Sequence, residues 1–294
     1  MRSRLQILIG LLMLTGCAST TVAPTPVFMA QEWAASCEPW DDWDKPAKPF
    51  HIHGQTWYVG TCGIAVLLVE TNDGLVLFDS GTEAGADVVL ANIRSLGFDP
   101  ADVALILSSH EHHDHVGGME KLRVTTGARV LASPAAASVM RTGRADPQDP
   151  QYGMHDGMTP VSKVESFDLT KPVAHGGTLF QAIATPGHTP GALSWTWESC
   201  HNEKCVDIVY ADSLSPVSRD DYRFSDHPDY VDRYRSGLGR LRTLPCAILL
   251  TPHPSASTML VKARDGDWFA PPDCKAYADG VERRLDERLE SEAE

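Results

Sequence analysis

Runs of β-branched and apolar residues, each cut by glycine or a turn sequence, mark the first third of this 294-residue chain as rich in strands. The sequence Asn72-Asp73-Gly74 between two of these runs is typical of a β-hairpin. Apolar residues then recur at helical spacing and lead into a short, fully apolar run. We therefore predict a meander of strands at 55–61, 63–70 and 75–78, a helix at 83–96 and a buried strand at 103–107.

The alternation of strand and helix patterns continues through the rest of the chain, which predicts an α/β fold. Residues 144–160 interrupt it, because they are rich in Asp, Gly, Pro and Met and show no periodicity. Such a stretch is typical of a long loop over a functional site. The further predicted helices are 116–125, 134–141, 228–241 and a terminal helix from 275, and the further strands are 129–132, 179–184, 192–198, 206–210 and 247–250.

The first residues form a separate unit, because Arg2 and Arg4 precede an apolar stretch from 5 to 14. This stretch is shorter than the roughly 20 residues that a membrane-spanning helix needs, and it fits the apolar region of an export signal. The sequence Leu14-Thr15-Gly16-Cys17 that ends it resembles a bacterial lipobox, in which the cysteine is lipidated and becomes the first mature residue. Cleavage by an ordinary signal peptidase within 18–30 is the alternative.

These features divide the chain into an export signal at 1–16, a flexible tether at 17–30 and one folded domain at 31–294. They place the protein in the periplasm, where lipid on Cys17 would anchor it to the outer membrane. The excess of 39 Asp and Glu over 25 Lys and Arg gives a net charge of −14, which opposes binding to nucleic acids. We expect a monomer that acts on a small molecule.

Six cysteines remain after Cys17, an even number that is typical of disulfides in an oxidising compartment. Six cysteines can pair in many ways, and proximity in the sequence favours Cys37–Cys62, Cys200–Cys205 and Cys246–Cys274. Free thiols or zinc ligands are the alternative, which the absence of any Cys-x-x-Cys spacing disfavours.

Candidate chemistry follows the predicted strand 103–107, where the chain reads Ser108-Ser109-His110-Glu111-His112-His113-Asp114-His115. Strand ends that open into loops are where α/β folds bind ligands. A His-x-His-x-Asp-His pattern arises by chance in about one such chain per thousand. Imidazole and carboxylate suit zinc, and the tight spacing allows His110 and His112 to face one ion while Asp114 and His115 face another.

Two further histidines follow predicted strands. His188 lies in Thr185-Pro186-Gly187-His188-Thr189-Pro190-Gly191, and His253 lies in Thr251-Pro252-His253-Pro254. Each taken alone is more typical of a structural loop histidine. Beside an incomplete set of metal ligands, however, they supply a third ligand for each ion and leave the open position that catalytic zinc requires.

Together these segments resemble the subclass B3 metallo-β-lactamases. The resemblance rests on His110 to His115 followed by Val116-Gly117-Gly118, on the His188 segment with the Trp-containing run 192–197, on Tyr210-Ala211-Asp212-Ser213-Leu214-Ser215-Pro216, and on the His253 segment. It spans roughly residues 31 to 275. The histidine motif is common to the whole superfamily, whereas the tryptophans and the Asp-Ser-Leu-Ser block are more specific to the subclass. The resemblance implies a four-layer αββα sandwich with the site at the sheet edges.

The resemblance also assigns roles. It implies that two zinc ions are bound, the first by His110, His112 and His188 and the second by Asp114, His115 and His253. It also implies that a hydroxide held between the ions opens the β-lactam amide of penicillins, cephalosporins or carbapenems. Asp114 would both ligate and orient the hydroxide. Ser213 and Ser215 would hold the substrate carboxylate, unless they only cap a turn. Such an enzyme would confer antibiotic resistance.

Several nearby residues receive no metal-binding role. Glu111 and His113 alternate with the predicted ligands, so we expect their side chains to point away from the metals. Asp79 follows a strand and is expected to support a ligand or form a turn. We assign no function to His51, His53 or His155.

Other functions occur on this fold, since a fold does not determine a substrate. A glyoxalase-like thioester hydrolase shares most of these ligands but uses an aspartate that bridges both metals, and Asp212 lies where such a residue could be. The export signal and the Asp-Ser-Leu-Ser context favour the lactamase. A diiron protein would require glutamate in place of His112. A binding module without activity would have lost ligands.

Overall fold

The computed structural model describes residues 29–293, so the predicted export signal, Cys17 and nearly all of the predicted tether lie outside the described residues. The first element among the described residues is α1 (Ala30–Ser36). No helix among the described residues has the length and apolar character needed to cross a membrane.

The first sheet has seven strands in the order of the chain, β1 to β7. The predicted meander is present, because β1 to β4 pair antiparallel and Asn72 and Asp73 join β3 to β4 with Thr71 opposite Gly74. From β4 onward the pairing is parallel. The strands are β1 (Phe50–His53), β2 (Thr56–Tyr58), β3 (Leu67–Thr71), β4 (Gly74–Phe78), β5 (Val103–Leu107), β6 (Arg129–Ala132) and β7 (Glu165–Ser166).

The second sheet has five strands in the order β12-β11-β10-β9-β8. Four of them form an antiparallel meander, and β12 joins its edge parallel to β11. Its strands are β8 (Val173–His175), β9 (Thr178–Ala184), β10 (Leu193–His201), β11 (Lys204–Tyr210) and β12 (Ile248–Leu250).

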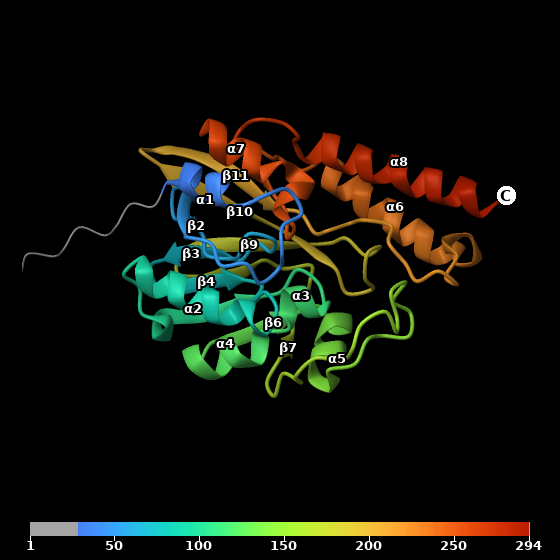
Figure 1. The fold of residues 1–294 in the computed structure, drawn as a ribbon, viewed down its shortest axis with the longest axis horizontal. Helices are drawn as coiled ribbons and strands as arrows, with labels where there is room; N and C mark the ends of the chain where they lie inside the picture. Colours follow the sequence, from blue (N-terminus) through green and yellow to red (C-terminus); the bar gives the residue numbers. More distant parts are fainter. Residues whose placement is uncertain (1–28, 294) are drawn as a thin grey trace, which may run out of the picture.

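Helices cover the outer face of each sheet, and Figure 1 shows α2, α4 and α5 on one side and α6, α7 and α8 on the other. The prediction of a four-layer αββα sandwich is therefore confirmed. The helices are α2 (Gly85–Ser95), α3 (His113–Val116), α4 (Met119–Thr126), α5 (Pro134–Thr142), α6 (Pro228–Arg242), α7 (Met259–Asp265) and α8 (Cys274–Glu292).

Strand β4 shows how the layers are built, because both of its faces are buried. Val76 and Phe78 belong to the core between the two sheets, whereas Leu75 and Leu77 belong to the core under α2, α4 and α5. Phe78 stacks on Trp197 of the second sheet with ring centroids 4.7 Å apart. Side chains alternate between the faces of a strand, so a strand between two apolar layers must be apolar throughout.

One helix that we predicted as continuous is divided in the structure. The helical pattern at 116–125 is divided into α3 and α4 by Gly117 and Gly118. A Cβ on Gly118 would lie 2.6 Å from Cβ of Ala86 and 2.7 Å from the carbonyl oxygen of Thr82. The chain therefore turns at the point where it passes closest to the start of α2. Helix α7 was not expected from the sequence.

The residues that the structure describes form three disulfides, and they pair as sequence proximity predicted: Cys37–Cys62, Cys200–Cys205 and Cys246–Cys274. The second closes the tip of the β10–β11 hairpin. The third ties the segment before β12 to the first residue of α8.

Candidate metal centre

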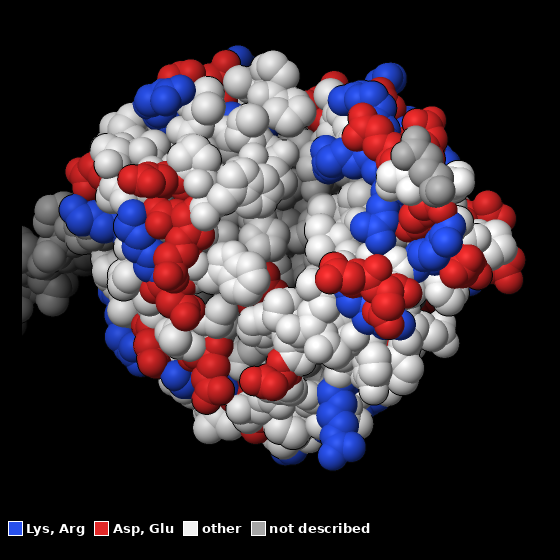
Figure 2. All heavy atoms as spheres, turned by 45° about the vertical axis from the view of Figure 1, so that its right-hand side comes forward, with Lys and Arg blue, Asp and Glu red and all other residues white. Residues whose placement is uncertain are grey.

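Loops from both sheets meet at one edge of the sandwich. The segment 108–115 follows β5, 185–191 follows β9, 211–216 follows β11 and 251–254 follows β12. The backbone N–H of Leu193 donates to the carbonyl of Ser109 at 2.7 Å, which links the two sheets at this edge. Figure 2 turns the right-hand side of Figure 1 toward the reader, and this face is hollowed near its middle, with mainly uncharged residue types visible inside.

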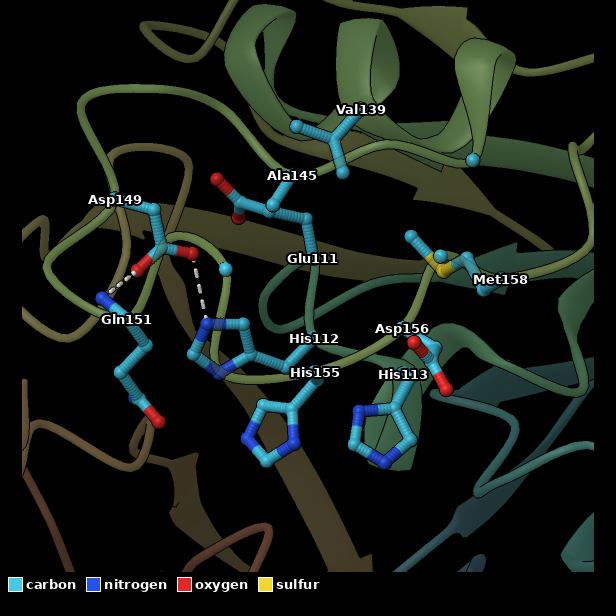
Figure 3. A pocket seen from close by; sticks show the side chains of 13 residues that line it. Glu111, His112, His113, Val139, Ala145, Asp149, Gln151, His155, Asp156 and Met158 are labelled. Carbon is cyan, nitrogen blue, oxygen red and sulfur yellow. Dashed lines mark hydrogen bonds and ion pairs between the residues drawn. The ribbon is translucent and has the colours of Figure 1, made fainter. Parts of the chain in front are cut away.

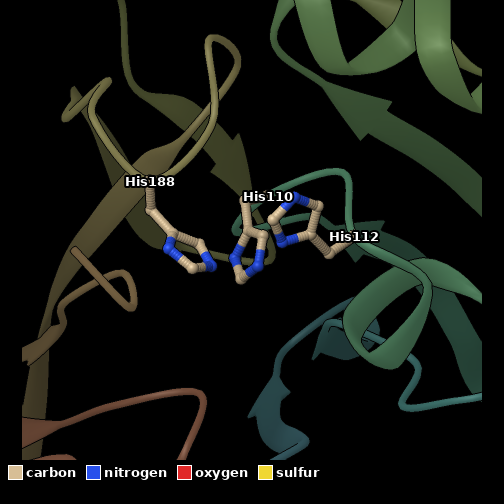
Figure 4. A group of neighbouring side chains, drawn as sticks. All are labelled: His110, His112 and His188. Atoms are coloured by element: carbon tan, nitrogen blue, oxygen red, sulfur yellow. The ribbon is translucent and has the colours of Figure 1, made fainter. Parts of the chain in front are cut away.

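Three of the predicted ligands form the first group. His110, His112 and His188 each offer one nitrogen, and the three atoms lie within 4.8 Å of one another. Figure 4 shows the three rings converging from two loops, one after β5 and one after β9. The group is largely buried, with His110 fully buried and His188 6% exposed. Neutral imidazoles at these separations are suited to binding a metal ion.

Contacts at Nδ1 fix the orientation of two of these imidazoles. Nδ1 of His110 lies 2.7 Å from Oδ1 of Asp212, and Nδ1 of His188 lies 2.9 Å from the carbonyl oxygen of Ser215. Since Nδ1 of each ring takes the donor role, Nε2 keeps its lone pair for a metal. Nε2 of His110 is buried and has no hydrogen-bond partner among the described residues. An orphaned acceptor in this position fits a bound metal ion.

His112 is oriented in the opposite sense. Its Nε2 lies 2.9 Å from Oδ2 of Asp149, so Nδ1 remains for the metal. Asp149 comes from the loop after α5 and is itself held by accepting the backbone N–H of Gln151 at 2.7 Å. Figure 3 shows both contacts, with the carboxylate between the imidazole and the loop backbone.

The other three predicted ligands form a second group beside the first. Nε2 of His115 lies 3.0 Å from Oδ2 of Asp114 and 3.3 Å from Nε2 of His253, and the last two atoms are 3.4 Å apart. Ligand atoms around a tetrahedral zinc ion lie about 3.3 Å from one another, given zinc–ligand bonds of about 2.0 Å. The rings of His110 and His115 are only 4.1 Å apart, so the two groups adjoin.

A comparison with known protein families decides the identity of the fold. The model of the Metallo-beta-lactamase superfamily matches residues 59–253, which include all six predicted ligands. The chain belongs to the metallo-β-lactamase superfamily. Within it, the solved structure of the MIM-2 metallo-beta-lactamase is 51% identical, with a TM-score of 0.85 over 90% of this chain and 98% of that chain.

Two other relatives place the chain within the superfamily. MEM-A1, a subclass B3 metallo-beta-lactamase from a soil metagenome library, is 37% identical, with a TM-score of 0.82 over 86% of this chain and 99% of that one. A hydroxyacylglutathione hydrolase of Ectopseudomonas mendocina is 33% identical over 142 residues, which are 48% of this chain and 43% of that protein. The chain thus spans about half the length of the curated relatives it matches, but nearly the whole of the subclass B3 structures.

Burial and neighbouring charges set the protonation of this metallo-β-lactamase-type site. Burial alone would raise the pKa of Asp114, but the imidazoles of His115 and His253 outweigh it and hold that pKa well below the usual range. Burial lowers the pKa of His188 to about 3. The carboxylate is therefore ionised and the imidazole neutral at pH 7, which are the forms that bind metals.

Asp79 supports this arrangement as the sequence led us to expect. Its carboxylate accepts the backbone N–H and hydroxyl of Ser109 at 2.6 and 2.7 Å and the hydroxyl of Tyr210 at 2.8 Å. It lies 3.9 Å from Nδ1 of His115 and has a positive φ of 65°. Burial raises its pKa to about 6. Asp79 thus links the end of β4 to the segment after β5 and places its carboxylate beside His115, a predicted ligand.

The residues that alternate with the ligands point elsewhere, as expected. Glu111 turns away from His112 in Figure 3, and the ring of His113 packs against that of His155 with centroids 4.8 Å apart. His51 and His53 bond to the carbonyl of Gly54 and to the hydroxyl of Ser199.

The structure also identifies site residues that the sequence did not. Asp149 orients His112, and Nε2 of Gln151 lies 3.4 Å from Nε2 of His188. Both belong to the aperiodic stretch 144–160, whose composition predicted a loop over the site. Nothing in that composition indicated which of its side chains would turn inward.

The two predicted substrate-binding serines differ in their surroundings. The hydroxyl of Ser213 is buried and has no hydrogen-bond partner among the described residues. Oγ of Ser215 lies 3.3 Å from Nδ1 of His188, whose ring also contacts the carbonyl of Ser215. Ser215 therefore contributes to orienting a metal ligand, whatever else it binds.

Proposed function

We propose that this protein is a subclass B3 metallo-β-lactamase that hydrolyses the amide bond of penicillins, cephalosporins or carbapenems with two zinc ions. The likeness to MIM-2, at 51% identity over nearly all of that chain, is the observation that carries the proposal. The paired donor groups support it, because histidine and carboxylate ligands with this spacing suit zinc.

His110, His112 and His188 would hold the first ion, and Asp114, His115 and His253 the second. When bound, the ions polarise the lactam carbonyl and lower the pKa of water toward neutrality. Oδ2 of Asp114 faces His115 and His253, which leaves Oδ1 to accept a hydrogen bond from the attacking water and orient it. Because Asp114 stays ionised at pH 7, it acts as an acceptor and not as an acid.

The buried hydroxyl of Ser213 and the nearby hydroxyl of Ser215 are the groups we propose for the substrate carboxylate. A hydrogen bond to a charged group contributes about 1.5–3 kcal/mol, so Ser215→Ala is expected to lower kcat/KM about 10- to 100-fold. The loss is expected mainly in KM, because the carboxylate is bound alike in ground and transition states.

Steady-state kinetics on several β-lactams test this assignment. Ser225→Ala is the control, since that serine is exposed on the following segment. If Ser213→Ala and Ser215→Ala both leave KM unchanged, the substrate carboxylate is held by other groups.

A thioester hydrolase is the second candidate, because hydroxyacylglutathione hydrolases are among the relatives. Oδ1 of Asp212 contacts Nδ1 of His110, whereas its Oδ2 is buried and has no hydrogen-bond partner among the described residues, so metal counting on an Asp212 variant distinguishes the two functions. Asp212→Asn is expected to retain two zinc ions at saturating metal, with the first bound about 10- to 100-fold more weakly. Native mass spectrometry of metal-loaded protein measures this. Loss of one ion at saturation would favour the thioester hydrolase.

A substrate panel separates the two functions directly. We expect hydrolysis of penicillins, cephalosporins or carbapenems and no measurable turnover of lactoylglutathione in the same buffer. Turnover of the thioester alone would reverse the assignment.

We also propose that the protein is exported to the periplasm and anchored at the outer membrane through lipid on Cys17. The disulfides support export, because such bonds persist in oxidising compartments. Cys17→Ser is expected to move the protein from the membrane fraction to the soluble periplasmic fraction. An unchanged distribution after fractionation would contradict the lipid anchor.

A further inference from the structure

The side chain of Glu111 connects the two loops that carry the first group of histidines. Glu111 lies between His110 and His112 in the chain, yet this residue is only 3% exposed and its side chain turns away from the ring of His112 (Figure 3). Its Oε2 accepts the hydroxyl of Thr189 at 2.8 Å, and its Oε1 accepts the backbone N–H of Gly191 at 2.8 Å. Both partners belong to the loop of His188.

The Glu111 carboxylate packs closely against the backbone of the His188 loop. A Cβ on Gly191 would lie 2.7 Å from both oxygens of the Glu111 carboxylate, so this approach requires glycine. The hydrogen bond from Leu193 to Ser109 joins the same two segments. The carboxylate therefore has one defined position, from which it holds a loop 78 to 80 residues away in the chain.

A buried carboxylate is costly unless its oxygens accept hydrogen bonds, and such charge-assisted bonds are about twice as strong as neutral ones. The bonds of Glu111 end on Thr189 and Gly191, one and three residues after His188. Releasing them would free the His188 loop relative to His110 and His112 while leaving every ligand in the chain. The loss would then appear in the geometry of the first metal group.

We infer that Glu111 is a positioning residue that clamps the His188 loop to the His110–His112 segment and thereby sets the affinity of the first metal site. This inference rests on the metal centre of the proposed function and adds a role to a residue that is not itself a ligand. The second group, formed by Asp114, His115 and His253, should be affected less, since no bond of the clamp reaches the loop of His253.

The test measures stepwise zinc dissociation constants of metal-free protein by competition with a chromophoric chelator. Glu111→Ala is expected to weaken one of the two constants about 10- to 100-fold, as loss of a partner behind a ligand does. Comparison with His188→Ala identifies the affected site as the first. Glu111→Gln is expected to weaken the same constant by less than Glu111→Ala, because a neutral amide can still bond both Thr189 and the N–H of Gly191 but without the charge.

Two further variants separate positioning from general stability. Thr189→Val keeps the shape of the side chain and removes one bond of the clamp, so it is expected to weaken zinc binding at the first site by less than Glu111→Ala does. The double variant, Glu111→Ala with Thr189→Val, is expected to weaken it no more than Glu111→Ala alone. Glu292→Ala is the matched control. That side chain is 6% exposed and accepts the backbone N–H groups of Phe224 and Ser225, on a helix without predicted ligands. We expect it to lower the melting temperature and leave both zinc constants unchanged.

Unchanged zinc constants in Glu111→Ala would overturn the inference. If Glu111→Ala does not fold, unchanged constants in Thr189→Val would do the same. Equal weakening in Glu292→Ala would reduce the role of Glu111 to ordinary stability and also overturn it. The proposed function is judged separately, by whether wild-type protein hydrolyses β-lactams, so either conclusion can fail without the other.

Discussion

Removal of the bound metal is expected to abolish β-lactam hydrolysis, and His188→Ala is expected to lower it by about 10³-fold or more. His188 supplies one of three nitrogens within 4.8 Å of one another, and its ring is oriented by the carbonyl of Ser215. Without it the first site keeps only His110 and His112. Since metal ions contribute several kcal/mol of charge stabilisation, the lost activity is large.

Metal analysis beside initial rates measures this effect. Adding zinc back to chelated wild-type protein should restore the rate, whereas His188→Ala should recover little at the same zinc concentration. His51→Ala is the matched control, because that imidazole contacts the carbonyl of Gly54 away from both donor groups. Full activity of metal-free protein would refute the proposed mechanism.

Loss of the Cys246–Cys274 bond is expected to lower the free energy of unfolding by about 3–4 kcal/mol when both cysteines are replaced by serine. The bond closes a loop with a sequence separation of 28, and cross-linking a loop of this length removes much of the entropy of the unfolded chain. Cys246 precedes β12, which leads to His253. We nevertheless expect metal content to stay unchanged at low temperature, because β12 is also held by its ladder with β11.

Thermal unfolding and metal counting test this expectation. The Cys200–Cys205 bond is the matched control, since its separation of 5 gives a smaller entropic effect, about 2 kcal/mol. Protein isolated from the periplasm should also show no free thiol before denaturation and reduction. A melting temperature no lower than that of the control variant would show that the longer loop adds no stability.

Much of the fold followed from local patterns. Strands β5 and β6 begin and end where the apolar runs predicted, and the Asn72-Asp73-Gly74 turn forms the expected hairpin. These strand and hairpin predictions are confirmed because a short apolar run flanked by turn residues has few ways to be buried. The sequence did not predict that the helix at 116–125 is divided. The division results from the close approach of Gly118 to the start of α2, a contact between separate segments of the chain.

Some residues of the metal centre could likewise be predicted from the sequence, and others could not. His110, His112, Asp114 and His115 are recognisable because one loop carries them within six residues. The partners that orient these rings are not recognisable, because Asp149 lies 37 residues from His112 and Asp212 lies 102 residues from His110. A lone aspartate in a loop carries no sign of the ring it will contact.

The sequence by itself determined the kinds of element, the pairing of the cysteines by proximity, and the residue types available to bind a metal. Only the tertiary structure decided which nitrogen of each imidazole stays free, and which loop the Glu111 side chain holds. The physical reason is that these contacts join separate loops. They exist only once the two sheets have packed and brought their strand ends to one edge.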